Sequence, residues 1–265
     1  MVSEGEGAGG EGELGAAHVS LAGTGVSSSA LPYAARRSAV CPALSDQRPS
    51  DTNMETPEGF RIVRAQPSDR DRVERLARTA FYPDEPMNVA LGNTRGPPTD
   101  QLLFLSALDE PHSLIAEDAS TGEAVGMCIN GIVSPEVHEK KKQLQPQDEV
   151  LRTVLHVLRT VWAEADVWSQ TAARSALEVR ILAVASSARG RGLAAALLAE
   201  SLRMAKEELR LPLALILCTS AFSAKLSRQA GMRLVYEKPY CQTDMPAQPP
   251  QPHDRIAIYM KDLQG

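Results

Sequence analysis

The chain has 265 residues and a formal net charge of −5, so it is long enough for one ordinary domain with a tail or for two small domains. An apolar share of 43% and a charged share of 23% are typical of globular proteins, which excludes disorder along the whole chain. The acidic balance argues against nucleic acid as the main partner, because phosphate backbones recruit basic surfaces. No apolar run reaches the roughly 20 residues of a membrane-spanning helix. We therefore expect neither a nucleic-acid nor a membrane partner.

Cysteine and histidine usage predicts no metal site. None of the four cysteines has another at CxxC spacing, and none of the five histidines has a partner at metal-ligand spacing. Scattered cysteines are typical of a reducing compartment. The first residues, MVSEGEGAGGEGELG, contain neither a basic n-region nor an apolar h-region, so they do not form a secretory signal. We expect a cytoplasmic protein.

The composition changes near Phe60. Residues 1–57 are rich in glycine, serine, proline and alanine and have almost no apolar periodicity. Such a segment cannot bury enough apolar surface to offset the entropy that is lost on ordering. We predict a low-complexity, disordered tail over residues 1–57 and a single folded domain over residues 58–265.

Apolar periodicity in the folded part predicts strands and helices in turn. Strands are expected at residues 60–65, 113–117, 124–133, 177–184, 213–218, 233–236 and 255–260. Helices are expected after Asp69 and at residues 99–108, 150–162, 193–209 and 221–230, whereas the charged stretch 136–148 is interpreted as a solvated helix end or loop. The order predicts an α/β fold, a single domain with a mixed central sheet flanked by helices.

A glycine-rich turn lies between a predicted strand and a predicted helix. It reads Arg189-Gly190-Arg191-Gly192-Leu193-Ala194. Small residues let the backbone approach a ligand closely, and the helix N-terminus offers unpaired N–H groups and a positive dipole end. Together with the two arginines, the turn predicts a site for a pyrophosphate or another anion.

The turn does not match the common nucleotide-binding loops. The P-loop pattern GxxxxGK[ST] is absent, and the dinucleotide pattern GxGxxG fails because Ala195 stands where its last glycine belongs. Four residues of RGRG in an acidic protein are a weak indication of RNA binding. A turn without any ligand remains the structural alternative.

An acidic loop, FYPDEPMN, places Asp84 and Glu85 between two prolines. The prolines restrict the loop, so a side chain in it is held at a lower entropy cost. Aromatic surroundings would raise the pKa of a carboxyl group by desolvation, which suits a general base. The alternative is an ordinary turn in which Asp84 caps a helix.

A pair of hydroxyl side chains follows the buried strand LALILC. Thr219 and Ser223 are four residues apart, so they could share a face in the first turn of a helix and there bind a polar group or relay a proton. The alternative is helix capping by Thr219 or by Ser220.

These segments together resemble a known superfamily. The R-x-x-G-x-A pattern of Arg189, Gly192 and Ala194, between a strand and a helix, is similar to the signature of the GNAT acetyltransferases. Within that superfamily, DEPMN, the segment CTSAFSA and the closing Pro252-His253 before a strand resemble the insect-type arylalkylamine N-acetyltransferases, including the dopamine N-acetyltransferases. The resemblance covers residues 58–265.

The resemblance implies a function and a set of site residues. Acetyl-CoA would be the co-substrate, its acetyl and pantetheine part held by the strand backbone at Leu182, Ala183 and Val184 and its pyrophosphate by Arg189, Gly190, Arg191, Gly192, Leu193 and Ala194. Glu85 would be the general base for a small-molecule amine. Thr219 and Ser223 would bind the amine and shuttle protons, although Thr219 stands where the family usually has serine. No metal is implied, and a monomer is expected.

Alternatives in other classes stay open from the sequence. The acceptor could be a polyamine or a protein or peptide amine, or the chain could bind CoA without turnover. A neutral, aromatic-lined pocket would favour an arylalkylamine, and a strongly acidic pocket would favour a polyamine. Candidates for contact with an aryl group are Phe81, Tyr82, Trp162, Trp168 and Phe222. Tyr236 is a possible general acid that the sequence does not place.

Overall fold

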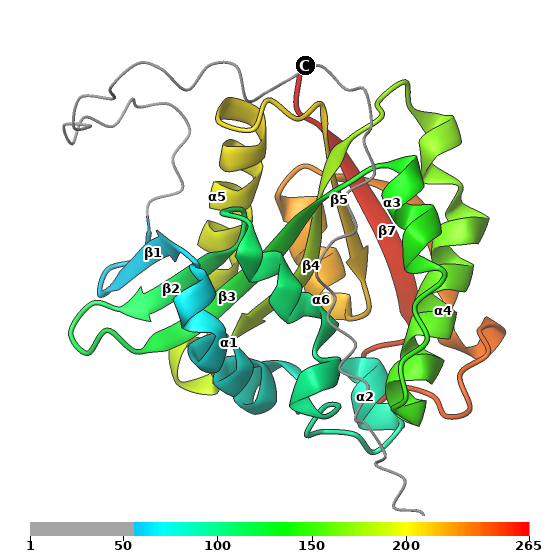
Figure 1. Ribbon diagram of the computed structural model, residues 1–265, viewed down its shortest axis with the longest axis horizontal. Helices are drawn as coiled ribbons and strands as arrows, with labels where there is room; N and C mark the ends of the chain where they lie inside the picture. The colour runs from blue at the N-terminus through cyan, green and yellow to red at the C-terminus, as the bar shows by residue number, and fades with distance from the viewer. Residues whose placement is uncertain (1–55, 265) are drawn as a thin grey trace, which may run out of the picture. The chain divides into compact units, whose positions relative to one another are not determined.

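The computed structural model describes residues 56–264, which form a seven-stranded mixed sheet covered on both faces (Figure 1). Strand order across the sheet is β1-β2-β3-β4-β5-β7-β6. The strands are β1 (Phe60–Arg64), β2 (Leu114–Asp118), β3 (Ala124–Val133), β4 (Ala176–Val184), β5 (Leu213–Cys218), β6 (Arg233–Pro239) and β7 (Arg255–Asp262). All but two of the 57 residues of the predicted tail lie outside the described residues.

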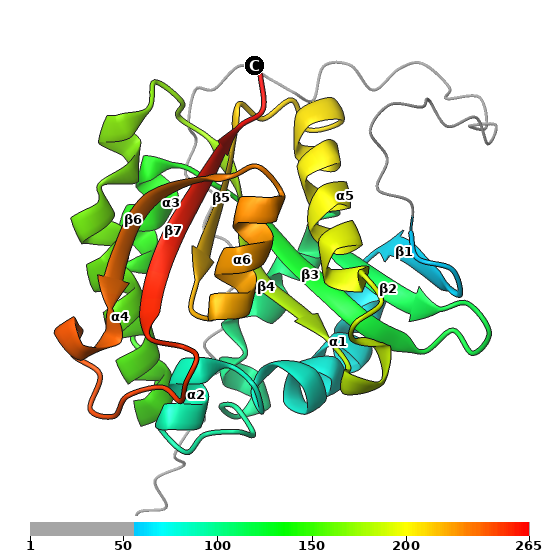
Figure 2. The same ribbon diagram turned by 180° about the vertical axis from the view of Figure 1, so that it is seen from behind.

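Helices cover both faces of the sheet. On one face lie α1 (Arg70–Leu76), α3 (Pro135–Lys141) and α4 (Glu149–Ala165), and on the other lie α5 (Leu193–Glu207) and α6 (Ala221–Gln229) (Figures 1 and 2). The short helix α2 (Pro86–Ala90) lies at one end of the sheet in both views. No helix within residues 56–264 is long and apolar enough to cross a bilayer.

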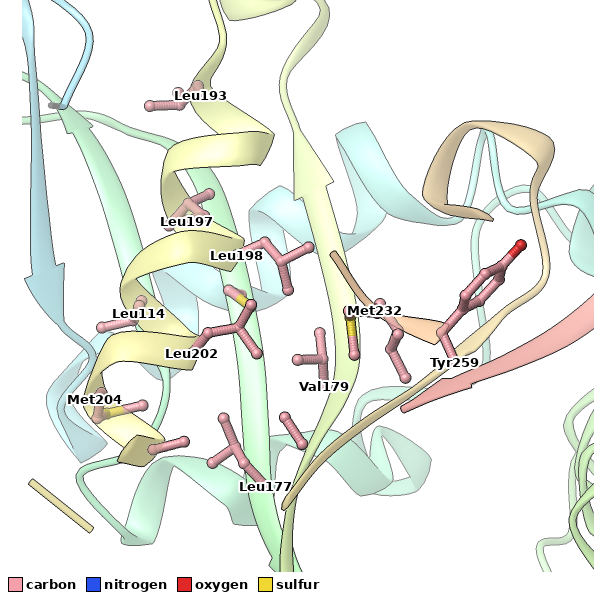
Figure 3. Close-up of a cluster of buried hydrophobic side chains, with 14 of the residues drawn as sticks. Leu114, Leu177, Val179, Leu193, Leu197, Leu198, Leu202, Met204, Met232 and Tyr259 are labelled. Atoms are coloured by element: carbon pink, nitrogen blue, oxygen red, sulfur yellow. The ribbon is translucent and has the colours of Figure 1, made fainter. Parts of the chain in front are cut away.

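The largest apolar cluster packs α5 against the sheet (Figure 3). Leu193, Leu197 and Leu198 recur at helical spacing along α5 and belong to one buried cluster with Leu177 and Val179 of β4. Leu197 and Leu198 are fully buried. This apolar stripe is what holds the start of α5, and with it the glycine-rich turn, against the end of β4.

The one parallel pairing of the sheet, between β4 and β5, is short. Only three residue pairs form it, the last being Val179 with Ile216. Beyond that point β4 continues along β3 and β5 continues along β7, so the two strands separate (Figure 2). Arg180 is an extra residue in the β3–β4 ladder, a β-bulge that increases local twist where the separation begins.

The fold predicted from the sequence is confirmed, with two local corrections. Residues 99–108 do not form an α-helix; they form two 3₁₀ segments, Thr99–Gln101 and Leu103–Asp109. The charged stretch contains α3, because the Ser134 side chain caps it by accepting from Val137 N at 3.3 Å and Lys141 forms an ion pair with buried Glu178 on β4. That tertiary pair has no signal in local periodicity.

Truncation of Leu197 to alanine should lower the free energy of unfolding by about 2–5 kcal/mol, because it opens a cavity between α5 and the sheet. Urea unfolding at equilibrium measures the change. Leu144→Ala is the control, since Leu144 is an exposed leucine whose loss should leave stability nearly unchanged. Equal effects of the two substitutions would contradict the packing described for α5.

Candidate active site

The predicted site residues lie at the end of β4 (Leu182, Ala183 and Val184) and on three further segments. We call residues 81–88 the acidic loop, residues 186–194 the glycine turn and residues 219–223 the hydroxyl corner. An ion pair between Asp84 and Arg189 joins the acidic loop to the glycine turn. The hydroxyl corner is joined to the connection between β6 and β7, residues 240–254, by two hydrogen bonds.

Glu85 of the acidic loop is buried and held by its own helix. It is the N-cap of α2, and its Oε2 accepts from the backbone N–H of Asn88 at 2.8 Å and from Asn88 Nδ2 at 2.5 Å. The cap is therefore Glu85 and not Asp84. A single π-type turn, Ala77–Phe81, precedes the loop and turns it toward the sheet end.

The second oxygen of this carboxylate is free. Glu85 Oε1 is buried and has no hydrogen-bond partner among the described residues. A buried carboxylate oxygen without a partner is costly, so the position favours a donor from outside the chain. The charge of Glu85 also reaches Tyr240 and His253 of the β6–β7 connection and acts to raise the pKa of both, although burial is the larger influence on each.

The glycine turn presents a row of backbone donors. Gly190 and Gly192 have φ of 74° and 79°, a left-handed conformation that favours glycine. No backbone carbonyl within residues 56–264 accepts from the N–H groups of residues 190–194. An added Cβ at Gly190 would meet nothing within 4 Å. Free donors at the N-terminus of a 15-residue helix can bind an anion.

Both arginine side chains of the turn are engaged elsewhere, so the anion site rests on backbone N–H groups. Arg189 Nε donates to Val184 O at 2.9 Å, and its Nη2 pairs with Asp84. Arg191 Nη2 donates to Glu58 O at 3.0 Å, and its guanidinium lies 4.2 Å from the ring centre of Phe60. The arginines fix the shape of the turn rather than point freely from it.

The end of β4 has an unpaired side. Ala185 N–H donates to Val125 O, so backbone alternation turns the polar groups of Leu182 and Val184 away from β3. On that side β5 has already separated, and Arg189 occupies only the carbonyl of Val184. The backbone at Leu182 can therefore pair with an extended ligand as a missing strand would.

The hydroxyl corner is shaped by a helix cap. Ser220 is the N-cap of α6, and its Oγ accepts from Ser223 N at 3.0 Å. The Ser223 hydroxyl donates to Ser220 O at 3.0 Å. Thr219 precedes the cap and is not part of the helix, so the two hydroxyls are close in sequence but do not share a helical face. The capping serine that the sequence offered as an alternative is Ser220.

His253 approaches the same corner from the β6–β7 connection. Its Nδ1 accepts from Ala221 N at 3.1 Å, and its ring meets Phe222 edge-on with centroids 5.2 Å apart. An accepting Nδ1 requires the neutral ring. Burial lowers the pKa of His253, which favours that neutral form.

The candidate aromatic residues fall into two groups. Phe81 and Tyr82 flank the acidic loop, and Phe222, 68% exposed, lies beside His253. Trp162 and Trp168 instead stack on His138 between α3 and α4. Tyr236 is also placed elsewhere: its hydroxyl donates to Glu164 of α4 at 2.5 Å, and burial, followed by that bond, raises its pKa to about 12.

Sequence reasoning assigned no role to Asn88, Tyr240 and His253. Asn88 could have been found from its position three residues after an acidic N-cap. The sequence singles out His253 only as part of the Pro252-His253 motif, and no local pattern points to Tyr240. No cluster of three or more potential metal-ligating side chains is found within residues 56–264.

Solved structures share this fold, although no protein-family model and no curated protein matches the chain. Mosquito arylalkylamine N-acetyltransferase like 5b has a TM-score of 0.70 at 22% identity, over 77% of this chain and 100% of that chain. Arylalkylamine N-acetyltransferase 2 from Aedes aegypti has a TM-score of 0.69 at 25% identity, over 78% and 100%. The Drosophila melanogaster polyamine N-acetyltransferase, described as forming N-acetylagmatine, has a TM-score of 0.67 at 22% identity, over 77% and 100%.

The chain thus has the GNAT fold in the form found in insect arylalkylamine N-acetyltransferases, as the motifs predicted. The likeness establishes the architecture in which the three segments meet.

Acidification should lower the free energy of unfolding, because His253 must take up a proton. Its pKa in the folded chain lies below the usual 6.5, so the unfolded chain binds more protons as the pH falls through 6.5. Stability declines across that window and the loss is complete below the folded-state pKa. Urea titrations at about pH 7.5 and pH 5 measure the slope, which should be smaller in His253→Gln.

His138 contributes a slope of the same sign, because burial lowers its pKa as well. The comparison therefore rests on the difference between variants. His138→Gln measures that share on its own, and the double variant should lose both shares of the slope. A slope in His253→Gln equal to that of the wild type would contradict the neutral, accepting ring.

Proposed function

We propose that the domain of residues 58–265 transfers the acetyl group of acetyl-CoA to the primary amine of an arylalkylamine such as dopamine, serotonin or tryptamine. The observation that carries the proposal is the buried Oε1 of Glu85, which has no hydrogen-bond partner within residues 56–264. The charge of Glu85 acts on Tyr240 and His253, which bond to the hydroxyl corner, and the neighbouring Asp84 pairs with Arg189 of the glycine turn. A protonated amine supplies the donor that Glu85 Oε1 lacks.

The glycine turn and the end of β4 fit acetyl-CoA. Free N–H groups at residues 190–194 suit the pyrophosphate, with Leu193 and Ala194 supplying the first turn of α5. The unpaired backbone groups of Leu182 and the N–H of Val184 suit the extended pantetheine and acetyl part, while Ala183 between them is held by its pairing with β3. Arg189 and Arg191 keep the turn in shape through their own contacts.

Glu85 acts as the general base. Most arylalkylamines are protonated near neutral pH, so a proton must leave nitrogen before attack. Oε1 accepts that proton, directly or through water, while Asn88 holds Oε2 and keeps the carboxylate aimed. Bound acetyl-CoA supplies the thioester carbonyl, which the neutral amine attacks with release of the thiolate. A backbone N–H at the free side of β4 donates to the developing oxyanion.

Thr219 and Ser223 bind the amine and relay protons in this proposal. The Ser223 hydroxyl donates to Ser220 O and lies 2.9 Å from Ser220 Oγ, so its proton is already engaged and the oxygen acts as an acceptor. Thr219 keeps a hydroxyl at the end of β5 with a side chain restricted by its extra methyl group. Their positions beside Tyr240 and His253 support a role at the same centre as Glu85.

The charges around the centre favour an arylalkylamine. Glu85 is free on one oxygen, whereas the neighbouring Asp84 is paired with Arg189. One free carboxylate, with Phe222 exposed beside His253, suits a monoamine with an aryl group better than a polyamine. A polyamine acceptor remains the second candidate, because the structures that share the fold include an agmatine N-acetyltransferase and a polyamine N-acetyltransferase.

We further propose a cytoplasmic monomer. Cys128 and Cys218 are buried and Cys241 is exposed, and all three are free thiols, which suits a reducing compartment. A small-molecule amine needs no partner chain for its recognition.

Replacement of Glu85 by glutamine should lower kcat by roughly 10²–10⁴-fold and remove the acid limb of the pH–rate profile, because the general base is lost. Thiol release from acetyl-CoA measures turnover with dopamine, serotonin, tryptamine, spermidine, agmatine and a peptide amine. Glu207→Gln is the control and should behave as the wild type, because Glu207 is an exposed carboxylate at the C-terminal end of α5, at the opposite end of that helix from the glycine turn.

Three outcomes of that panel decide between the candidates. Turnover with the aryl amines, lost in Glu85→Gln with acetyl-CoA affinity retained, supports the proposal. Turnover with spermidine or agmatine alone moves the assignment to polyamines, and with the peptide alone to peptide amines. No turnover with any amine, despite measurable CoA binding, would leave a CoA-binding protein and contradict the proposed reaction.

Gly192→Ala should weaken acetyl-CoA binding, because alanine resists the left-handed φ of 79° and would distort the N–H row. Gly231→Ala is a matched control, since Gly231 has φ of 71° just after the C-terminal end of α6, where the atom nearest to an added Cβ is Lys261 Nζ at 3.5 Å. Both should lose about 1–2 kcal/mol of stability. Calorimetric titration with CoA distinguishes them, and equal CoA affinity in both variants would contradict the predicted cofactor site.

A further inference from the structure

The hydroxyl corner has two backbone groups that no ladder or helix can satisfy. β5 ends at Cys218, which pairs with Ala257 of β7, and α6 begins at Ala221. Between them, the Thr219 carbonyl lies past the end of the ladder, and the Ala221 N–H is one of the unpaired donors at a helix start. Left alone, this corner could rotate about its φ and ψ dihedral angles.

Two side chains from one connection hold these groups. The Tyr240 hydroxyl donates to Thr219 O at 2.7 Å, and His253 Nδ1 accepts from Ala221 N at 3.1 Å. The two residues are themselves tied together, because Tyr240 N donates to Asp254 O at 3.0 Å. Tyr240 therefore binds the carbonyl of the corner and His253 binds its N–H group. The two residues form one hydrogen-bonded unit, which we call the clamp.

The burial and the backbone position of Tyr240 fix its side chain for the contact with Thr219. Its side chain is fully buried, packed with Met87 of α2 and Met245 in the apolar cluster under α4. It follows directly on β6, so its backbone position is set by the sheet edge. The ring thus reaches from the far edge of the sheet, beneath α2, to the corner at the end of β5.

We infer that Tyr240 is a positioning residue for the proposed acetyl transfer: its hydroxyl orients the Thr219–Ser220 peptide and so places the amine-binding hydroxyls of Thr219 and Ser223 opposite Glu85. The inference rests on the proposed function and names a residue to which that function assigned no role. Ser220, whose N–H belongs to the oriented peptide, carries the cap that holds Ser223.

The hydroxyl stays a donor wherever the enzyme works. Burial raises the pKa of Tyr240 strongly, with further increases from the charges of Glu85 and Cys218. A hydroxyl group that stays protonated and donates a hydrogen bond to a carbonyl does not exchange protons with the substrate. Tyr240 therefore acts through Thr219 and not on the reacting atoms.

The test compares two tyrosines that each lose one hydroxyl. Tyr240→Phe keeps the buried ring and removes the bond to Thr219 O. Tyr259→Phe is the matched control, because Tyr259 is also buried and its hydroxyl accepts from Arg228 at 2.6 Å, on a different part of α6. Each variant is assayed for amine KM and kcat with tryptamine, for CoA affinity, for thermal stability and for amide hydrogen exchange.

Tyr240→Phe should raise the amine KM by about tenfold, because the corner loses the bond that orients it, and should leave CoA affinity unchanged. The Ala221 and Ser223 amides should exchange faster than in the wild type. Tyr259→Phe should change neither the KM nor those two exchange rates, whatever small stability it loses.

Several outcomes would overturn the inference. They are an unchanged amine KM in Tyr240→Phe, a loss of amine and CoA binding together, unchanged exchange at the corner, or failure of Tyr240→Phe to fold where Tyr259→Phe folds. The last would make the hydroxyl a general stability element. Absence of turnover in the wild type would instead contradict the proposed function, and the exchange comparison still decides whether Tyr240 holds the corner.

Discussion

The separation of β4 and β5 is the constraint on which the rest of the site depends. Two parallel strands that stay paired satisfy each other's backbone groups along their length. Here pairing stops at Val179 and Ile216, and the bulge at Arg180 twists β4 away. The chain gains an unpaired strand side where β4 and β5 separate, and the polar groups there must be satisfied by other means.

The polar groups of the candidate site fall into two sets. In the first set, Arg189 donates to the Val184 carbonyl, and the clamp binds the carbonyl and the N–H group of the hydroxyl corner. In the second set, Glu85 Oε1 and the backbone N–H groups of the glycine turn have no partner within residues 56–264. A carboxylate oxygen on one side and amide donors on the other match a cation and an anion, which is the charge pattern of an ammonium substrate beside a phosphate-bearing one.

The fold and the local parts of the site could be predicted from the sequence, because alternation, helical spacing and glycine turns are short-range properties. β5 has the predicted bounds, and the turn after β4 lies where its small residues indicated. What links the parts could not be predicted. Arg189 pairs with Asp84, which lies 105 residues away in the sequence. His253 accepts a hydrogen bond from Ala221, which lies 32 residues away. Likewise, α3 depends on Lys141 meeting Glu178, a contact that only the folded sheet creates.

The β6–β7 connection also has a consequence for engineering this protein. Connections between strands are usually where tags and inserted peptides are tolerated, and a segment with Pro246, Pro249, Pro250 and Pro252 resembles such a linker. In this chain both ends of the connection hold the hydroxyl corner, and its prolines limit how far the ends can drift apart. The length of the connection is therefore matched to the distance between its two contacts with the hydroxyl corner, so an insertion there would disturb the corner.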